Sequence, residues 1–191
     1  MSAVGSRAGF LWQWVRNPRA MGSVTPSSRF LVRAILNQID FASAHRVCEL
    51  GPGNGVFTGP ILDHLAPGSG LLALDTNAGW VHYLDQRFGD ARLYARHASA
   101  EHLLRECQEV GWDGADVVVS GIPYSLLPRE VTRSILVAVR ESLAPGGLFV
   151  GYQYSRYLRP LLIDVFGNVR YGFEPRNFPP AFVYTARKTT T

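Results

Sequence analysis

Residues 49–57 read ELGPGNGVF, a run in which Gly51, Gly53 and Gly55 occupy alternate positions directly after an apolar stretch. Glycine allows a sharp turn, and it lets backbone amides approach a ligand that a side chain would exclude. A structural tight turn would need the same residues, so the run alone does not decide between the two. Its place between an apolar run and an amphipathic one predicts a junction from a strand to a helix.

The pattern outward from this turn is an alternation of short apolar runs with amphipathic ones. The predicted strands cover residues 46–50, 71–75, 91–95, 115–120 and 148–154. The predicted helices between them cover residues 56–65, 79–87, 100–110 and 128–143. Segments 168–173 and 181–186 flank a proline-rich turn and predict an antiparallel hairpin. The expected α/β fold is a Rossmann-like, doubly wound, mostly parallel seven-stranded sheet with this hairpin at its C-terminal edge.

Length and composition favour one domain in a reducing compartment. The chain has 191 residues, of which 47% are hydrophobic, enough for one substantial core. No stretch reaches the roughly 20 apolar residues of a membrane-spanning helix, and the start lacks a signal-peptide pattern. Cys48 and Cys107 are far apart in sequence and lack zinc-site spacing, so neither a disulfide nor a metal site is expected. We expect a cytoplasmic protein.

The first residues form a separate unit in this interpretation. Residues 1–24 are expected to hold an amphipathic helix and a hinge, and residues 25–191 the main domain. Phe10, Leu11, Trp14 and Val15 would share an apolar face, and Arg16 lies beyond it. Tryptophan beside arginine is typical of a helix that lies on an anionic membrane surface. The alternative is a lid that packs over the site, and the two roles can coexist.

The second predicted strand ends in an acid, Asp75, placed to reach ribose hydroxyls where the strand order reverses. Nicotinamide-binding domains place a third glycine three residues after the second, where this chain has Val56. The pattern E-x-G-x-G-x-G with an acid ending the next strand instead resembles the class I S-adenosylmethionine-dependent methyltransferases. The resemblance implies S-adenosylmethionine as cofactor. It implies cofactor contacts from Glu49, Gly51, Gly53, Gly55, Asp75, Thr76, Ala98, Ser99, Ala100 and Ser120.

Residues 120–128, SGIPYSLLP, follow the fourth predicted strand. In enzymes that methylate adenine N6, a similar loop uses an Asn oxygen and a Pro carbonyl to accept hydrogen bonds from the amino group. This chain has Gly121 in place of that Asn, so it keeps Pro123 and Tyr124 but no amide acceptor. An Asn restored at Gly121 is expected to matter little to an enzyme with another substrate. A nucleic-acid adenine methyltransferase of the ribosomal RNA type remains one alternative.

Both ends of the chain resemble the bacterial phospholipid N-methyltransferases, in WVRNPRAMGSVTPSSR at residues 14–29 and RNFPPAFVY at residues 176–184. The resemblance implies methylation of phosphatidylethanolamine towards phosphatidylcholine by a peripheral enzyme of the inner leaflet. No nucleic acid is expected as partner and no protein partner is identifiable. A small-molecule methyltransferase and a catalytically silent binding module are further alternatives.

The substrate side of the site is assigned on the same basis. Gly121 and Ile122 would line the pocket, Arg176 would pair with the phosphodiester and Asn177 would orient the head group. An edge hairpin with one exposed arginine is the plain alternative. Pro123, Tyr124 and Tyr154 are the predicted catalytic residues. Both tyrosines are expected to face the crevice, where each would accept a proton, orient the amine or hold methylated nitrogen by cation–π contact.

Overall fold

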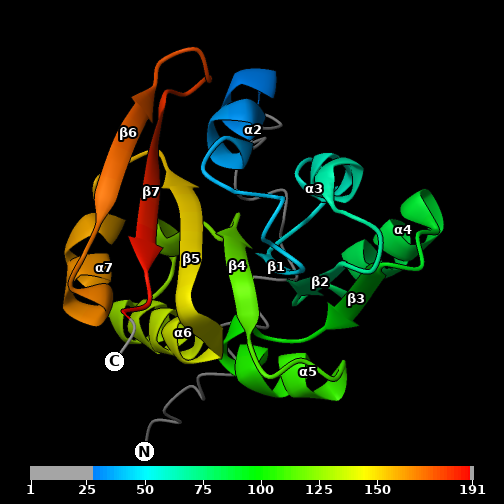
Figure 1. Ribbon diagram of the computed structural model, residues 1–191. Helices are drawn as coiled ribbons and strands as arrows, with labels where there is room; N and C mark the ends of the chain where they lie inside the picture. The colour runs from blue at the N-terminus through cyan, green and yellow to red at the C-terminus, as the bar shows by residue number, and fades with distance from the viewer. Residues whose placement is uncertain (1–27, 190–191) are drawn as a thin grey trace, which may run out of the picture.

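A seven-stranded sheet forms the centre of the protein in the computed structural model, which describes residues 28–189 (Figure 1). Its strands are β1 (Arg46–Leu50), β2 (Gly70–Asp75), β3 (Leu93–His97), β4 (Ala115–Ser120), β5 (Leu143–Gln153), β6 (Arg170–Glu174) and β7 (Ala181–Arg187). Their order is β3-β2-β1-β4-β5-β7-β6. Strands β1 to β5 pair in parallel, and β7 pairs antiparallel with β5 and β6. The predicted sheet and its edge hairpin are therefore confirmed.

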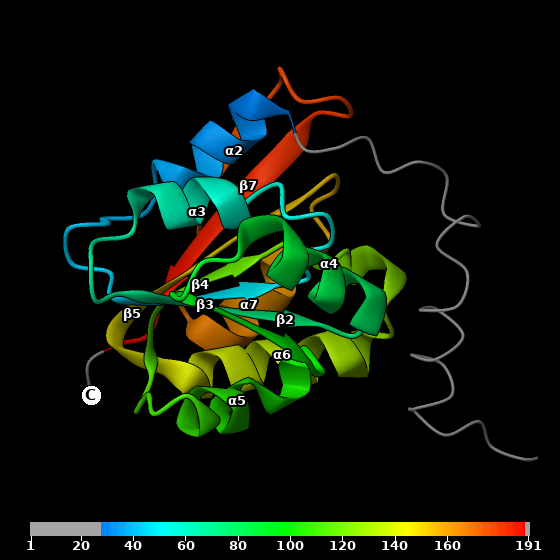
Figure 2. The same cartoon turned by 90° about the vertical axis from the view of Figure 1, so that its right-hand side faces the viewer.

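Helices cover both faces of this sheet (Figure 2). One face carries α2 (Arg29–Leu36), α3 (Thr58–His64) and α4 (Ala78–Phe88), and the other carries α5 (Leu103–Glu109), α6 (Arg129–Ser142) and α7 (Leu158–Phe166). The valines of β4 separate the layers, because Val117 and Val119 pack with α2 and α3 while Val118 packs with α6. Strands that are buried on both faces have continuous apolar sequences, and for this reason the sequence predicts the strands of this core.

Two local features differ from the predicted pattern. Strand β3 spans residues 93–97 rather than 91–95, because the Asp90 carboxylate accepts hydrogen bonds from the Arg92 backbone and guanidinium and holds the preceding residues in a turn. Helix α7 was not predicted. Pro160 lies in its first turn, where backbone N–H groups have no helical acceptor, so the missing N–H of proline costs no helical hydrogen bond.

The two cysteines are neighbours in space despite their separation in sequence. Cys48 on β1 and Cys107 on α5 are fully buried free thiols, with their Sγ atoms 3.7 Å apart. They form part of the packing between the sheet and α5.

No helix within residues 28–189 is long and apolar enough to cross a membrane. The predicted N-terminal helix, residues 1–24, lies outside the described part of the chain and stays a prediction.

The strand order reverses between β1 and β4, and the candidate site lies at this position in the sheet. The loops that follow these two strands meet at the carboxyl edge of the sheet, where the Gly121 N–H donates to the Leu50 carbonyl at 2.8 Å. On the other side of β1, the Gly51 N–H donates to the Leu74 carbonyl of β2 at 2.9 Å. Ligands of open α/β sheets bind in such a crevice, outside the carboxyl ends of the strands.

Candidate active site

The glycine turn adopts a backbone that other residues rarely adopt. Gly51, Gly53 and Gly55 have φ values of 68°, 53° and 80°. A Cβ at Gly55 would lie 2.8 Å from the Phe88 ring, and one at Gly51 would lie 3.3 Å from the Ile122 side chain. At Gly53 a Cβ would meet no protein atom within 4 Å. All three positions therefore favour glycine by their left-handed backbone; Gly55 is in addition closely packed, whereas Gly53 borders open space.

Asp75 at the end of β2 lies directly against this turn. Its Oδ2 accepts a hydrogen bond from the Gly53 N–H at 3.2 Å, and its Oδ1 accepts one from the Asn77 N–H at 2.8 Å. Burial raises the pKa of Asp75, while these two N–H groups act in the opposite direction. The carboxylate thus links β2 to the turn, and it keeps lone pairs for the ribose hydroxyls that its position predicts.

Glu49 brings a buried carboxylate under the same turn. Its side chain is 1% exposed, its Oε2 accepts a hydrogen bond from the Thr58 hydroxyl at 2.7 Å, and its Oε1 has no partner among residues 28–189. Burial raises the pKa of Glu49 to about 7, and the nearby Asp75 charge adds to this effect. An unpartnered carboxylate oxygen favours a cationic ligand group. The ammonium of a methionine moiety has that character, so these residues fit S-adenosylmethionine.

The raised pKa of Glu49 predicts a pH dependence of stability. Its folded-state pKa of about 7 lies above the ordinary 4.5, so folding favours the protonated form. The stability is fully present below pH 4.5 and is lost as the pH rises through 7, by on the order of 3 kcal/mol. We expect Glu49→Gln to remove this loss in urea unfolding at pH 5 and pH 8.

Glu141→Gln is the matched control, because Glu141 is exposed on α6. It should leave the pH profile of the wild type intact. An unchanged profile in Glu49→Gln as well would contradict a buried carboxyl whose pKa is raised to about 7.

The segment after β3 lies beside Asp75, where its predicted adenine contact requires it. The Ala98 N–H donates to the Asp75 carbonyl at 3.1 Å, and the His97 ring lies 3.1 Å from the Thr76 carbonyl. The Ser99 hydroxyl accepts a hydrogen bond from the Glu101 N–H and caps the short helix at Ala100–His102. The contact of residues 98–100 with adenine stays a prediction.

Gly121 has no room for a side chain, which corrects the expectation that an Asn there would matter little. A Cβ at Gly121 would lie 2.9 Å from the Gly51 carbonyl oxygen. This is closer than a methyl group approaches a backbone oxygen, so any larger residue must displace the glycine turn. The loop after β4 and the turn after β1 therefore form one packed unit.

We expect Gly121→Ala to lower the affinity for S-adenosylmethionine about tenfold, and stability by about 1–3 kcal/mol, because overpacking displaces the turn. Gly172→Ala in β6 is the control, since a Cβ there meets nothing within 4 Å. Calorimetric titration and urea unfolding measure the two effects. Equal affinities of the two variants would contradict the packing argument.

A residue that the sequence analysis missed holds this loop against β5. Gln153 is 4% exposed, and its Nε2 donates to the Ile122 carbonyl at 2.8 Å and to the Tyr152 carbonyl at 2.6 Å. A polar residue at the carboxyl end of a predicted strand was the available signal. Thr58, which hydrogen-bonds Glu49, gave no comparable signal.

Tyr124 does not face the crevice as expected. Its ring is fully buried in the core shared with α6, and its hydroxyl lies 2.9 Å from the Ser120 hydroxyl. Burial raises its pKa further above the ordinary value of 10. A phenol that is enclosed and so weakly acidic is not placed to touch a substrate or accept its proton. Tyr124 and Ser120 stabilise the loop after β4 from its core side.

Tyr154 is the predicted tyrosine that reaches the surface. Its side chain is 39% exposed, and its ring meets the Tyr152 ring edge-on at 5.8 Å. Burial raises the pKa of Tyr154, although hydrogen bonds to Asn177 and Tyr152 lower it. The phenol therefore stays neutral near pH 7, which disfavours direct proton abstraction and leaves orientation or cation–π contact as its chemistry.

Arg176 and Asn177 both bind other residues of the fold. The Arg176 guanidinium donates to both carboxylate oxygens of Glu174, at 2.8 and 2.9 Å, and lies over the Phe30 ring. Asn177 is 3% exposed, with its Oδ1 accepting from the Ser28 N–H at 2.9 Å. Both residues thus fasten α2 to the β6–β7 turn, and their predicted contacts with a head group stay a prediction.

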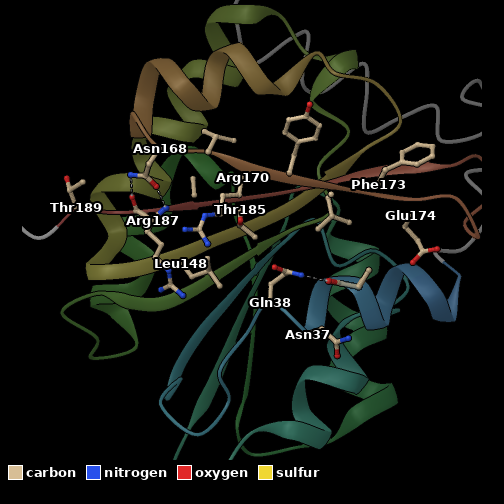
Figure 3. A pocket seen from close by; sticks show the side chains of 16 residues that line it. Asn37, Gln38, Leu148, Asn168, Arg170, Phe173, Glu174, Thr185, Arg187 and Thr189 are labelled. Carbon is tan, nitrogen blue, oxygen red and sulfur yellow. Dashed lines mark hydrogen bonds between the residues drawn. The ribbon is translucent and has the colours of Figure 1, made fainter.

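A groove of about 740 Å³ lies on the face of the sheet between α2 and the β6 edge (Figure 3). Arg170, Thr185 and Leu148 project from the strands into it, and Asn37 and Gln38 approach from the end of α2. None of the predicted cofactor residues lines this groove. It is separate from the crevice between β1 and β4.

Known proteins resemble this chain at two levels. The ornithine lipid N-methyltransferase of Singulisphaera acidiphila is 33% identical over 184 residues, which cover 93% of this chain and 94% of that protein. Ribosomal RNA small subunit methyltransferase A of Burkholderia mallei is 39% identical over 160 residues, 71% of this chain. The chain spans 56% of the length of that second relative. No protein-family profile matches the chain.

Among solved structures, the N-methyltransferase NodS of Bradyrhizobium japonicum in complex with S-adenosylhomocysteine has a TM-score of 0.68. Its sequence is 14% identical, and the match covers 94% of this chain and 98% of that one. At this identity the likeness shows the fold, which is that of a methyltransferase. Together with the nearly full-length match to a lipid-modifying relative, it shows that the chain belongs to the class I S-adenosylmethionine-dependent N-methyltransferases, in the family that includes the ornithine lipid enzyme.

Proposed function

We propose that this protein transfers methyl groups from S-adenosylmethionine to the amine nitrogen of a membrane lipid, with phosphatidylethanolamine or its methylated derivatives as substrate. The observation that carries the choice of a lipid amine is the close packing of Gly121 on the Gly51 carbonyl. The position where adenine methyltransferases hold an Asn has no space for a side chain. The loop has backbone carbonyls that could orient an amine, but it has no side-chain amide that could recognise a base.

The proposed cofactor contacts follow the site from β1 to β3. The open space over Gly53 would admit the methionine end, the unpartnered Glu49 oxygen would bind its ammonium, and Asp75 would bind the ribose. When bound, the sulfonium supplies an already activated methyl group. The protein's own contribution is then alignment of the acceptor, which accounts for a large part of such a rate enhancement.

The acceptor amine would lie between the β4 and β5 loops. Gln153 fixes the Ile122 carbonyl, and with it the position of Pro123, at the front of the crevice. Tyr154 on the adjoining loop offers a neutral ring and hydroxyl to an ammonium or a methylated amine. Loss of the proton to water before attack is compatible with this arrangement, since neither predicted tyrosine is suited to abstract it.

Two further parts of the proposal concern partners. Residues 1–24 are proposed to contact the anionic inner leaflet, on the basis of the tryptophan and arginine pattern alone. Methylation of ribosomal RNA is the second candidate, and the Burkholderia mallei relative is the observation that favours it. The two functions differ in acceptor and in salt dependence, because RNA binding weakens steeply with salt.

The test is a competition with S-adenosylmethionine that carries a labelled methyl group. The protein is incubated with phosphatidylethanolamine vesicles, with ornithine lipid vesicles and with unmodified small-subunit RNA, separately and together. We expect label in phosphatidylethanolamine. Label in ornithine lipid alone would correct the head group but keep the lipid amine, whereas label in RNA alone would replace the proposed function.

A further inference from the structure

Three loops at the carboxyl edge of the sheet each expose one large apolar or aromatic side chain beside an arginine. Leu126 follows β4, Tyr154 follows β5 and Phe178 lies in the β6–β7 turn, with exposures of 45%, 39% and 79%. An arginine lies within three residues of each. We call this set the rim: Leu126, Arg129, Tyr154, Arg156, Arg176 and Phe178.

Contacts link the three loops that carry the rim residues. Gln153, next to Tyr154, hydrogen-bonds the Ile122 carbonyl of the β4 loop. The Asn177 side chain, next to Phe178, interacts with the Tyr154 hydroxyl. The loops after β4 and β5 and the β6–β7 turn are therefore joined at the carboxyl edge of the sheet.

The most exposed ring of the rim is held outward by a braced turn. The Asn177 Nδ2 donates to the Pro179 carbonyl at 2.7 Å, so a hydrogen bond spans Phe178. Two prolines follow Phe178 and restrict the backbone. On the other side of the turn, the Glu174 carboxylate fixes the Arg176 backbone N–H and guanidinium. Phe178 is therefore 79% exposed on a turn whose backbone is fixed.

The rim faces the same direction as the site. Gln153 at the end of β5 pairs with Phe182 at the start of β7, so the β6–β7 turn extends beyond the carboxyl ends of the parallel strands. Figure 1 shows this turn and α2 at the upper side of the molecule, past the ends of β4 and β5. The Ser28 N–H donates to the Asn177 Oδ1, so the start of α2 lies against the β6–β7 turn.

The charge of the rim suits an anionic surface. Arg129 and Arg156 form no ion pair with any residue from 28 to 189, and Arg156 lies 5.4 Å from the Phe182 ring centre. Glu174 neutralises Arg176, and Glu130 adjoins Arg129. The unpaired arginines therefore leave a modest positive balance, in a chain whose net charge is +4. Exposed aromatic and apolar groups beside unpaired arginines fit the interface of an anionic bilayer.

We infer that the rim is a membrane-docking surface that inserts Phe178 and Leu126 into the interface of an anionic lipid bilayer and turns the crevice towards the head groups. The inference rests on the proposed function for its substrate, because a lipid amine held in a bilayer reaches the crevice only from this side. It places a docking contact on the folded domain, in addition to the contact proposed for residues 1–24.

A fluorophore at position 178 tests the inference in the full chain. Phe178→Cys is labelled with nitrobenzoxadiazole, and Cys48 and Cys107 are buried and so protected from the reagent. Gln108→Cys is the matched control, because Gln108 is exposed near the end of α5, before β4 begins at the opposite edge. Vesicles of phosphatidylethanolamine and phosphatidylglycerol are added, with and without a spin-labelled lipid that quenches at the interface.

We expect a blue shift and lipid quenching at position 178 and neither at position 108. Phe178→Ala should lower the vesicle partition coefficient roughly tenfold. Arg129→Gln with Arg156→Gln should lower it on these vesicles and not on phosphatidylcholine alone. Vesicle binding with no change at position 178, an equal change at both positions, or no vesicle binding by the wild type would each overturn the inference.

Methylation of detergent-solubilised lipid separates this inference from the proposed function. Phe178→Ala should keep wild-type activity on solubilised phosphatidylethanolamine, because docking is then not required. A wild type that docks through position 178 but methylates no solubilised lipid would refute the function and leave the docking surface standing. A wild type that methylates solubilised lipid but does not dock through position 178 would refute the docking surface alone.

Discussion

Gly53→Ala is expected to lower the affinity for S-adenosylmethionine roughly 100-fold, as measured by calorimetric titration. Gly53 has a φ of 53°, and the space around its missing Cβ is free of protein atoms within 4 Å. That space is where the proposed cofactor approaches the backbone, so a methyl group would occupy the ligand's volume. The same substitution costs about 1–2 kcal/mol of stability, because alanine disfavours a left-handed backbone.

Gly68→Ala separates the two effects. Gly68 has a φ of +81° and equally open surroundings, but it precedes β2 at the amino edge of the sheet. It should lose similar stability and bind the cofactor like the wild type. If both variants bind equally well, the cofactor does not lie over Gly53.

Asp75→Asn is expected to weaken cofactor binding about 10- to 100-fold, the range for losing hydrogen bonds to a charged acceptor. The amide oxygen can accept from only one of the Gly53 and Asn77 N–H groups, because these donate to different oxygens of Asp75, and the other oxygen is replaced by a donor. Burial already raises the pKa of Asp75, so removing the charge removes a desolvation cost. We therefore expect the free energy of unfolding to change by no more than about 1 kcal/mol.

Asp116→Asn is the control, and it should have the opposite effects on stability and on cofactor affinity. Asp116 also accepts hydrogen bonds from two backbone N–H groups, those of His45 and Arg46, but it lies at the amino edge of the sheet. Its ion pair with Arg46 lowers its pKa, so the charged form stabilises the fold. The Asn variant should be less stable and bind the cofactor normally. A loss of affinity in Asp116→Asn but not in Asp75→Asn would reject the proposed ribose site.

The parts of the site that the sequence predicted are those determined by local backbone chemistry. The turn at residues 51–55 needs glycine for its own φ values, and Asp75 follows directly from the end of a buried strand. The parallel core was legible because β1, β2 and β4 are buried on both faces and read as apolar runs. Such features do not depend on how distant segments pack.

The features that the sequence did not predict concern side chains whose surroundings come from distant parts of the chain. Tyr124 follows a strand at the crevice, but its ring turns into the core shared with α6. Asn177 is buried because it binds the Ser28 N–H, 149 positions away. Gln153 acts through the Ile122 carbonyl, 31 positions away. No spacing within a single segment reports such contacts.

The most direct test of the central claim is the position of the transferred methyl group. Phosphatidylethanolamine is incubated with the protein and S-adenosylmethionine that carries a deuterated methyl group, and the extracted lipid is fragmented by tandem mass spectrometry. The lipid amine account predicts deuterated methyl on the head-group nitrogen, and about 10- to 100-fold less of it with Asp75→Asn when the cofactor is kept well below its wild-type dissociation constant. Deuterated methyl on adenine of added ribosomal RNA, with none in the lipid, would contradict the account.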